Sequence, residues 1–285
     1  MTPAGARPTT ASANLRAVEA HNRRRTLVLL AVVLVGAVVV GGTVGLVGGS
    51  AVAGAFGGLV LAGAGSAVAL TRVVPVLVAL TGARRADAGR HARLLNLTEG
   101  LCLAAGAPQP DVYVVDDGGL NAFTVGLGPG RTALAVTEGL VEGLGRIELE
   151  AVVARQLALV RSGETRRATV ALALVGRPAM ALLRLLPHAL RESLARGLRR
   201  VLCSTQDPEA DLAGVRLTRY PPGLIEALGK VAGAAAVRSA PTWSSPLWFA
   251  EPAPGMPGPG GIPSDLPPLQ CHRPIDERIE ALKEL

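Results

Sequence analysis

Residues 148–164 read E-L-E-A-V-V-A-R-Q-L-A-L-V-R-S-G-E, and this stretch decides the fold class of the chain. Glu148 and Glu150 stand at its start, where negative charge is favourable beside the positive end of a helix dipole. We therefore expect a helix over residues 147–160. The chemistry that this helix can carry depends on the polar residues in its middle, Arg155 and Gln156.

The same stretch has the frame of the zinc-binding motif H-E-x-x-H, in which two histidines one helical turn apart bind the metal and a glutamate activates water. Here those three positions are Arg155, Gln156 and Leu159. Arginine stays protonated in proteins and leucine has no ligand atom, so neither side chain can bind a cation. The amide of Gln156 cannot exchange a proton as a general base does. We therefore expect this helix to hold no metal and no catalytic residue.

Further segments extend the similarity over residues 26–285. In chain order they are 96–103, P-D-V-Y-V-V-D-D (110–117), N-A-F-T-V-G (121–126), A-V-T-E-G-L-V (135–141), L-E-A-V-V-A (149–154), D-P-E-A-D (207–211) and H-R-P-I-D-E-R-I (272–279). This series resembles the HtpX-type and CAAX prenyl protease family of integral-membrane zinc endopeptidases. The resemblance implies an α+β fold, a mostly helical zincin-like domain with a small antiparallel sheet, anchored by a transmembrane hairpin. It does not imply activity, because the departures fall on the chemical groups.

The third zinc ligand of the family is a glutamate four residues before an aspartate. That position is Asp207 here, counted back from Asp211. A carboxylate can bind zinc, but one carboxylate alone does not make a zinc site. If the fold is kept, Arg155 and Asp207 face one cleft from two packed helices, and the guanidinium takes the place of zinc as the partner of the carboxylate. In the alternative interpretation, both residues occupy solvated positions.

The histidines and cysteines offer no replacement site. No two of the four histidines share a helical turn, and Cys102, Cys203 and Cys271 are widely spaced without a C-x-x-C motif. We therefore predict no disulfide framework. Cys102 lies in an apolar helical run and is expected in the core.

In active members of the family, the strand that carries N-A-F lies beside the cleft and pairs with an extended substrate. The resemblance places Asn121, Ala122 and Phe123 at that edge. A sheet edge can bind a peptide through backbone hydrogen bonds without any metal. In the alternative, structural interpretation, Phe123 fills the core and Asn121 caps a turn.

No charged residue occurs in the 46 residues between Arg25 and Arg72. A single span needs about 20 apolar residues, so the run predicts a transmembrane hairpin over 26–82, with spans at 26–47 and 51–71. Arginines flank both ends, whereas the turn at 48–50 has none. The positive-inside rule then places both flanks and the bulk of the chain in the cytoplasm. We expect a multi-pass protein of the cell membrane.

A second apolar zone over 168–190 contains arginines at spacings of seven: Arg177, Arg184 and then Arg191. Such residues share one helical face. We interpret 168–202 as interfacial amphipathic helices, although a true span remains the alternative.

The remaining sequence divides simply. Residues 1–25 are expected to form a disordered basic tail, and 83–285 a metallopeptidase-like cytoplasmic domain with a Pro/Gly-rich loop at 239–270. Short strands are expected at 111–115, 122–125 and 132–136, the last two as a hairpin. The net charge of +7 fits contact with the anionic headgroups of a lipid bilayer, whereas 2% aromatic residues and the absence of a binding module argue against nucleic acid.

These features favour a membrane-anchored, catalytically inactive pseudopeptidase that binds a protein or peptide. No cofactor is expected, whereas active relatives use zinc. Two other functions stay open: an active zinc metalloendopeptidase with unrecognised ligands, and a structural membrane scaffold.

Overall fold

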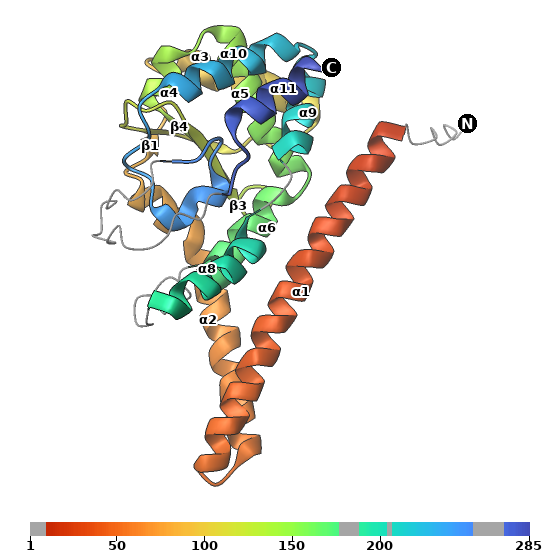
Figure 1. Cartoon of the computed structure of the whole chain (residues 1–285), viewed down its shortest axis with the longest axis vertical. Helices are drawn as coiled ribbons and strands as arrows, with labels where there is room; N and C mark the ends of the chain where they lie inside the picture. Colours follow the sequence, from red (N-terminus) through yellow and green to blue (C-terminus); the bar gives the residue numbers. More distant parts are fainter. Residues whose placement is uncertain (1–9, 177–187, 204–206, 253–270) are drawn as a thin grey trace.

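The computed structural model describes residues 10–176, 188–203, 207–252 and 271–285. Two long helices, α1 (Thr10–Val47) and α2 (Ala51–Leu80), form a hairpin that projects from a domain built from the rest of the chain (Figure 1). Both helices are long and apolar enough to cross a membrane. The predicted pair of candidate spans is therefore confirmed, and the turn lies at the predicted glycines, with Gly49 in the left-handed region at φ +93°.

The prediction of a disordered tail is wrong for residues 10–25, which continue α1, while residues 1–9 lie outside the described part of the chain. Tertiary contacts explain the extra helix. Asn22 and Thr26 are buried, and Asn22 Nδ2 donates a hydrogen bond of 3.0 Å to the carbonyl of Ser162 in the domain. The contact ties α1 to the domain just before the uncharged run that begins at Thr26.

The domain contains one four-stranded sheet in the order β1-β2-β4-β3. Its strands are β1 (Arg84–Arg85), β2 (Asp111–Val115), β3 (Ala122–Gly126) and β4 (Thr132–Thr137). The predicted hairpin of β3 and β4 is antiparallel, as expected, but β2 and β4 run parallel. The sheet is therefore mixed, not antiparallel throughout. The connection after β2 carries the chain to the far edge before β3, so β4 returns between them in the direction of β2.

Helices surround this sheet and make the domain mostly helical, which confirms the fold class. They are α3 (Ala92–Ala105), α4 (Glu138–Gly143), α5 (Arg146–Arg161), α6 (Glu164–Ala171), the π-helix η1 (Leu172–Gly176), α8 (His188–Leu202), α9 (Asp207–Thr218), α10 (Pro221–Gly233), the 3-10 helix η2 (Thr242–Leu247) and α11 (Ile275–Lys283).

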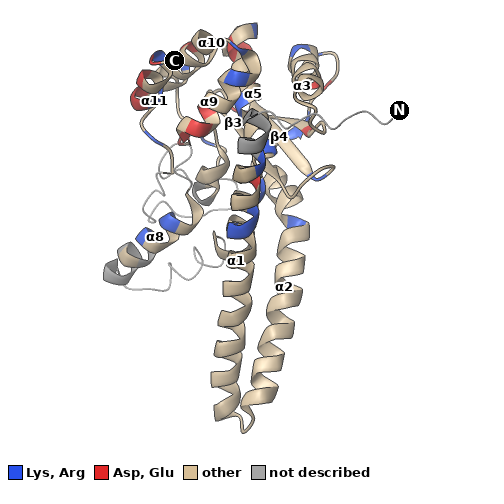
Figure 2. Cartoon of the chain, turned by 90° about the vertical axis from the view of Figure 1, so that its right-hand side faces the viewer, with Lys and Arg blue, Asp and Glu red and all other residues tan. Residues whose placement is uncertain are grey.

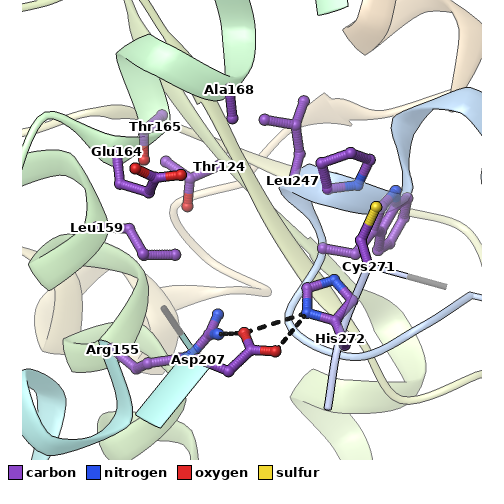
Figure 3. A pocket seen from close by; sticks show the side chains of 12 residues that line it. Thr124, Arg155, Leu159, Glu164, Thr165, Ala168, Asp207, Leu247, Cys271 and His272 are labelled. Carbon is purple, nitrogen blue, oxygen red and sulfur yellow. Dashed lines mark hydrogen bonds and ion pairs between the residues drawn. The ribbon is translucent and has the colours of Figure 1, made fainter. Parts of the chain in front are cut away.

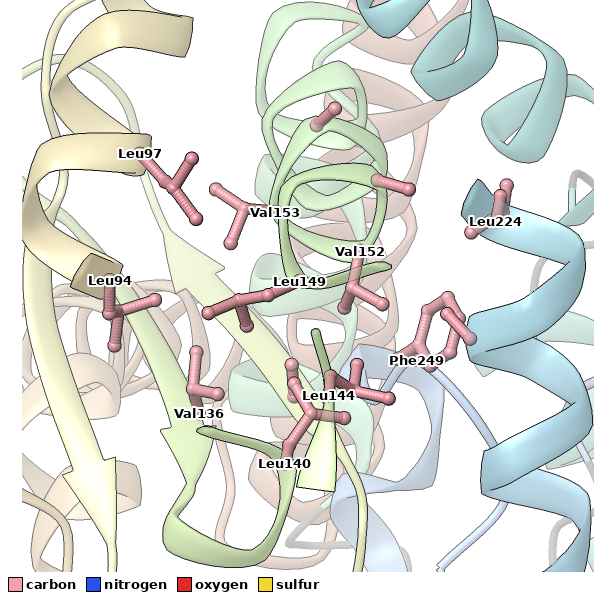
Figure 4. Close-up of a cluster of buried hydrophobic side chains, with 14 of the residues drawn as sticks. Leu94, Leu97, Val136, Leu140, Leu144, Leu149, Val152, Val153, Leu224 and Phe249 are labelled. Atoms are coloured by element: carbon pink, nitrogen blue, oxygen red, sulfur yellow. The ribbon is translucent and has the colours of Figure 1, made fainter. Parts of the chain in front are cut away.

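Helix α5 is the predicted helix of the opening stretch, and it is central to the core. Its apolar side chains Leu149, Val152 and Val153 lie between α3 and the sheet on one side and α10 on the other (Figure 4). Glu148 accepts the backbone N–H of Gly145 at 2.6 Å and so closes the first turn. The polar side chains of α5 contact other elements: Arg155 reaches α9 and Gln156 reaches β3.

The zone predicted to be interfacial divides into two parts. Residues 168–176 are mostly buried in the domain, because Ala171 and Leu172 belong to the same apolar cluster as Leu77 of α2. Helix α8 is amphipathic, with Leu198 and Leu202 buried and Arg196, Arg199 and Arg200 exposed. The basic residues of α8 lie at about the height of those on α1 and α2 (Figure 2). Its position at a membrane surface stays a prediction, and Arg177 and Arg184 lie outside the described residues.

Candidate functional site

Arg155 of α5 meets two aspartates at the beginning of α9. Its Nη2 donates to Asp207 Oδ1 at 2.7 Å, and its Nε donates to Asp211 Oδ1 at 2.9 Å. The two aspartates are four residues apart and so share one helical face. All three side chains are buried, Arg155 with 1% of its surface exposed. The hypothesis that Arg155 and Asp207 pair is confirmed, and the solvated alternative is wrong.

A second arginine completes the cluster. Arg278 of α11 donates to both carboxylate oxygens of Asp211 at 2.8 Å and to the carbonyl of Phe249 at 2.9 Å. Both guanidinium groups also lie over the ring of Phe249. Cζ is 5.2 Å from the ring centroid for Arg155 and 5.0 Å for Arg278, within the range of a cation–π interaction. Sequence reasoning missed the roles of Asp211 and Arg278. Their signal was their presence in the two segments that end the quoted series.

Asp207 has further partners from the segment that precedes α11. Its Oδ1 lies 3.2 Å from His272 Nδ1, and its Oδ2 accepts the backbone N–H of Arg273 at 3.0 Å. Burial alone would raise the pKa of Asp207. The hydrogen bond from His272, and the positive charges of His272, Arg155 and Arg278, outweigh burial and hold the pKa of this carboxyl well below its usual range. Asp207 is therefore ionised at neutral pH.

Gln156, at the position of the catalytic base, has both ends of its amide engaged. Its Oε1 accepts the hydroxyl of Thr124 at 2.9 Å, and its Nε2 donates to the carbonyl of Ala122 at 3.2 Å. An ionised glutamate in this place could accept the first bond but could not donate the second. The amide therefore joins α5 to β3 as a structural tie.

Arg155, Leu159 and Asp207, the three positions that the sequence comparison aligned with zinc ligands, border one small pocket of about 30 Å³ (Figure 3). The structure thus brings together the residues that the motif predicted to be neighbours. Their donor chemistry does not fit zinc, because the guanidinium offers only N–H donors and the leucine offers no ligand atom. Within the described ranges, no group of three or more His, Cys, Asp or Glu residues could hold a metal ion.

The predicted peptide-binding edge is engaged by the chain itself. Asn121 Nδ2 donates to the carbonyl of Ala250 at 2.9 Å, and its Oδ1 accepts the N–H of Ala250 at 3.1 Å. The N–H of Phe249 donates to the carbonyl of Ala122 at 2.7 Å, and Phe123 packs on Trp248 with ring centroids 4.7 Å apart. Phe123 is fully buried, as the structural interpretation required, whereas Asn121 binds a distant strand-like segment instead of only capping a turn.

A disulfide joins Cys203, at the end of α8, to Cys271, which precedes His272. The prediction of no disulfide framework did not anticipate this bond. The two residues are 68 positions apart in sequence, yet their Cα atoms lie 4.7 Å apart. Spacing along the chain says nothing about such a distance. Cys102 is buried as predicted, and burial raises the pKa of its thiol.

Comparison with known proteins identifies the family. Residues 88–285 match Peptidase family M48. The protease HtpX homologue of Dictyoglomus turgidum is 30% identical over 232 residues, which cover 73% of this chain and 74% of the relative. The HtpX homologues of Listeria innocua and Streptococcus pneumoniae are 29% and 30% identical over 315 and 303 residues, each covering 93% of this chain and 98% of the relative. The chain, with its two candidate spans and its zincin-like domain, belongs to peptidase family M48 and resembles the membrane-bound HtpX type.

Proposed function

We propose that this chain is a catalytically inactive member of its family, a membrane-anchored pseudopeptidase that binds a protein or peptide and does not hydrolyse it. The observation that carries the proposal is the buried bond between Arg155 Nη2 and Asp207 Oδ1, 2.7 Å long. The carboxylate that would complete a zinc site is already neutralised by a permanent cation. A divalent ion at this place would have to displace that cation from a buried pair, which would leave Arg155 Nη2 buried without its acceptor.

The proposal predicts the metal content of the purified protein and the behaviour of a repaired motif. The wild-type protein should contain far less than one zinc per chain and should not cleave unfolded protein substrates. The triple variant Arg155→His, Gln156→Glu and Leu159→His should bind zinc, because positions 155, 159 and 207 border the same pocket. Elemental analysis after dialysis measures the zinc content of both proteins.

The variant Leu159→His alone is the matched control, since one imidazole beside Arg155 does not make a site. Asp207→Ala added to the triple variant should remove the gained zinc. Stoichiometric zinc in the wild-type protein, with hydrolysis that a chelator abolishes, would establish the active metalloendopeptidase instead.

The scaffold function is favoured by one observation: the chain's own residues 248–250 lie along β3, where an extended ligand would pair. A binding function at this edge requires that segment to move. Trp248→Gly removes the ring that packs on Phe123 and should loosen the segment. Photo-crosslinking of an extended peptide to β3 should therefore increase in Trp248→Gly if the edge binds peptides. A pure scaffold should give no crosslink in either protein.

For the orientation, we propose that both ends of the hairpin and the bulk of the chain lie in the cytoplasm. Arginines flank the spans on the side of the domain, which supports this proposal. The disulfide of Cys203 with Cys271 points the other way, because disulfides persist mainly outside the reducing cytoplasm. A reporter fused after Leu285 that is active only in one compartment decides between the two, and labelling of the cysteines in intact cells gives an independent answer.

A further inference from the structure

A strap made of residues 244–251 covers the outer edge of the sheet. Strand β3 ends the strand order β1-β2-β4-β3, so one side of it has no neighbouring strand of the sheet. The strap takes that side: the N–H of Phe249 donates to the carbonyl of Ala122 at 2.7 Å, and Trp248 forms an antiparallel bridge with Phe123. An extended peptide would pair with β3 through the same backbone groups, so the edge is open only when the strap has moved away.

A carboxylate ties the strap to the segment that precedes α11. Glu251 Oε1 accepts the hydroxyl of Ser245 at 2.5 Å, and Glu251 Oε2 accepts the backbone N–H of Cys271 at 2.8 Å. The carbonyl of Ser245 also lies 2.9 Å from His272 Nε2. Both ends of the strap are therefore held by Cys271 and His272, which together form its anchor.

The anchor is fixed covalently to α8. Cys271 forms the disulfide with Cys203, which lies 68 positions away and directly follows the last residue of α8. Helix α8 packs on the domain through its buried side chains Leu198 and Leu202. A continuous path therefore runs from α8 through the disulfide to the anchor, and from the anchor to the strap on β3.

The cross-link restrains the state with a lifted strap more than the state with a closed one. When the strap lies on β3, the anchor is already beside Cys203, so the bond removes little freedom. When the strap is lifted, the anchor could move with it, and the bond forbids those arrangements. Burial of Trp248 and Phe249 also holds the strap in place. Loss of the cross-link therefore does not release the strap outright, but raises the fraction of molecules in which it is lifted.

We propose that the disulfide is a redox-controlled latch: it holds the strap on β3, and its reduction by a dithiol raises the fraction of molecules with an open edge. One thiolate of the dithiol attacks Sγ of the half-buried Cys203, and the S–S bond breaks with Cys271 leaving as a thiolate that takes up a proton. The second thiol of the reductant then displaces Cys203, so the products are two cysteine thiols and one disulfide of the reductant. The inference rests on the proposed function, because it adds a regulation to the edge where a peptide is proposed to bind.

The test compares the oxidised full-length protein in detergent micelles with the same protein reduced by dithiothreitol. Alkylation after unfolding counts the thiols: Cys102 alone in the oxidised form, and all three cysteines in the reduced form. Hydrogen exchange read by mass spectrometry follows the amides of Phe249 and Ala250, which donate to Ala122 and Asn121 when the strap is closed. Reduction should accelerate their exchange at least about tenfold, a conservative share of the effect of losing a cross-link.

Three variants separate the latch from general effects of reduction. Cys203→Ala should show the fast exchange of the reduced protein without any reductant; if this variant does not fold, the reduced wild-type protein reports the same quantity. Cys102→Ala is the matched control, since Cys102 is a buried thiol outside the bond, and it should keep the full response to reduction. Glu251→Ala removes the carboxylate between the strap and the anchor, so the strap should exchange fast in both redox states.

Three results would overturn the inference: unchanged exchange of the strap on reduction, equal acceleration in the strap and in α3, or an undiminished response to reduction in Glu251→Ala. On the same samples, a hexapeptide of alternating valine and threonine that carries a benzophenone tests peptide binding. Faster exchange of the strap without a crosslink to β3 supports the latch and counts against the proposed function. Crosslinking that increases in Trp248→Gly but not on reduction rejects the latch alone.

Discussion

Two helix pairs in this molecule approach closely at glycines: α1 with α2 in the hairpin, and α5 with α9 in the domain. The first contact is between uncharged residues, whereas the second lies beside buried ion pairs. In the hairpin, a Cβ added at Gly54 of α2 would lie 2.2 Å from the carbonyl oxygen of Gly41 in α1. In the domain, a Cβ added at Gly214 of α9 would lie 2.8 Å from the Cα of Arg155 in α5. Both pairs therefore bring two backbones together at a position where no side chain fits.

The surroundings decide what each close approach is used for. The far half of the hairpin carries no Lys, Arg, Asp or Glu (Figure 2). Its two helices approach closely where glycines such as Gly41 and Gly54 face each other. In the domain, the contact at Gly214 sets α9 close enough for Asp207 and Asp211 to reach Arg155. Close helix contact at a glycine thus occurs both between uncharged helices and beside buried charges. In the domain the buried charges are tolerated because Arg155 is paired with Asp207 and Asp211.

The strongest way to break this comparison is to remove one charge from the domain. Asp211→Ala should lower the free energy of unfolding of the domain by about 3–5 kcal/mol, because it leaves Arg155 Nε and Arg278 buried without their shared carboxylate. Urea unfolding followed by tryptophan fluorescence measures the loss. Asp276→Ala, at an exposed aspartate of α11, is the control and should change stability little. A loss below about 1 kcal/mol for Asp211→Ala would mean that the cluster is as weak as a solvated ion pair.

Gly214→Ala tests the close approach itself. The added methyl should push α9 away from Arg155 and lower the free energy of unfolding by about 1–3 kcal/mol. Gly229→Ala in α10 is the matched control, since a Cβ there meets nothing within 4 Å, and it should stabilise the domain by about 0.8 kcal/mol through helix propensity. The same direction of change in both variants would contradict the role of Gly214.

Gly54→Ala applies the same change to the hairpin. The expected loss is smaller, about 1 kcal/mol in the free energy of packing α1 against α2. Two helices joined by a short turn can separate in lipid without exposing apolar surface to water. The distance between spin labels at the exposed positions Val35 and Leu61 should increase. Gly57→Ala should not change it, because a Cβ there meets nothing within 4 Å. Unfolding of the domain should be the same in both variants.

Acid tests the contribution of one carboxyl of the cluster, Asp207, and the expected effect is the smallest of the four. The pKa of Asp207 is lowered in the folded protein, so its ionised form contributes stability above the unfolded pKa of about 4, and that contribution is lost as pH falls further. The difference in unfolding free energy between the wild-type protein and Asp207→Asn should be constant from pH 7 to about pH 5 and should shrink below about pH 4. A difference that grows on acidification would reverse the sign and contradict the stabilising role of the carboxylate.

The sequence predicted much of the candidate site because the spacing of the motif places its residues on one face of a helix. Arg155 and Leu159 are one turn apart on one helix, so their shared pocket follows from helix geometry. The pairing with Asp207 required the family resemblance, since the two residues are 52 positions apart. The pairing of Arg278 with Asp211, 67 positions away, did not follow from helix geometry either, and its only signal was that both residues lie in the quoted segments. The placement of residues 248–250 on β3 was equally unpredictable, because backbone hydrogen bonds depend little on side-chain identity.

The sequence by itself determined which functional groups stand at positions 155, 156 and 159 and which segments are apolar enough to enter a membrane. A guanidinium, an amide and an isobutyl group lack the atoms of a zinc site in any fold, and a long uncharged run is apolar wherever it lies. Only the tertiary structure decided that Arg155 pairs with Asp207 and Asp211, that Cys203 meets Cys271, and that β2 runs parallel to β4. Those features are distances and directions between remote parts of the chain, and packing of the whole core sets them.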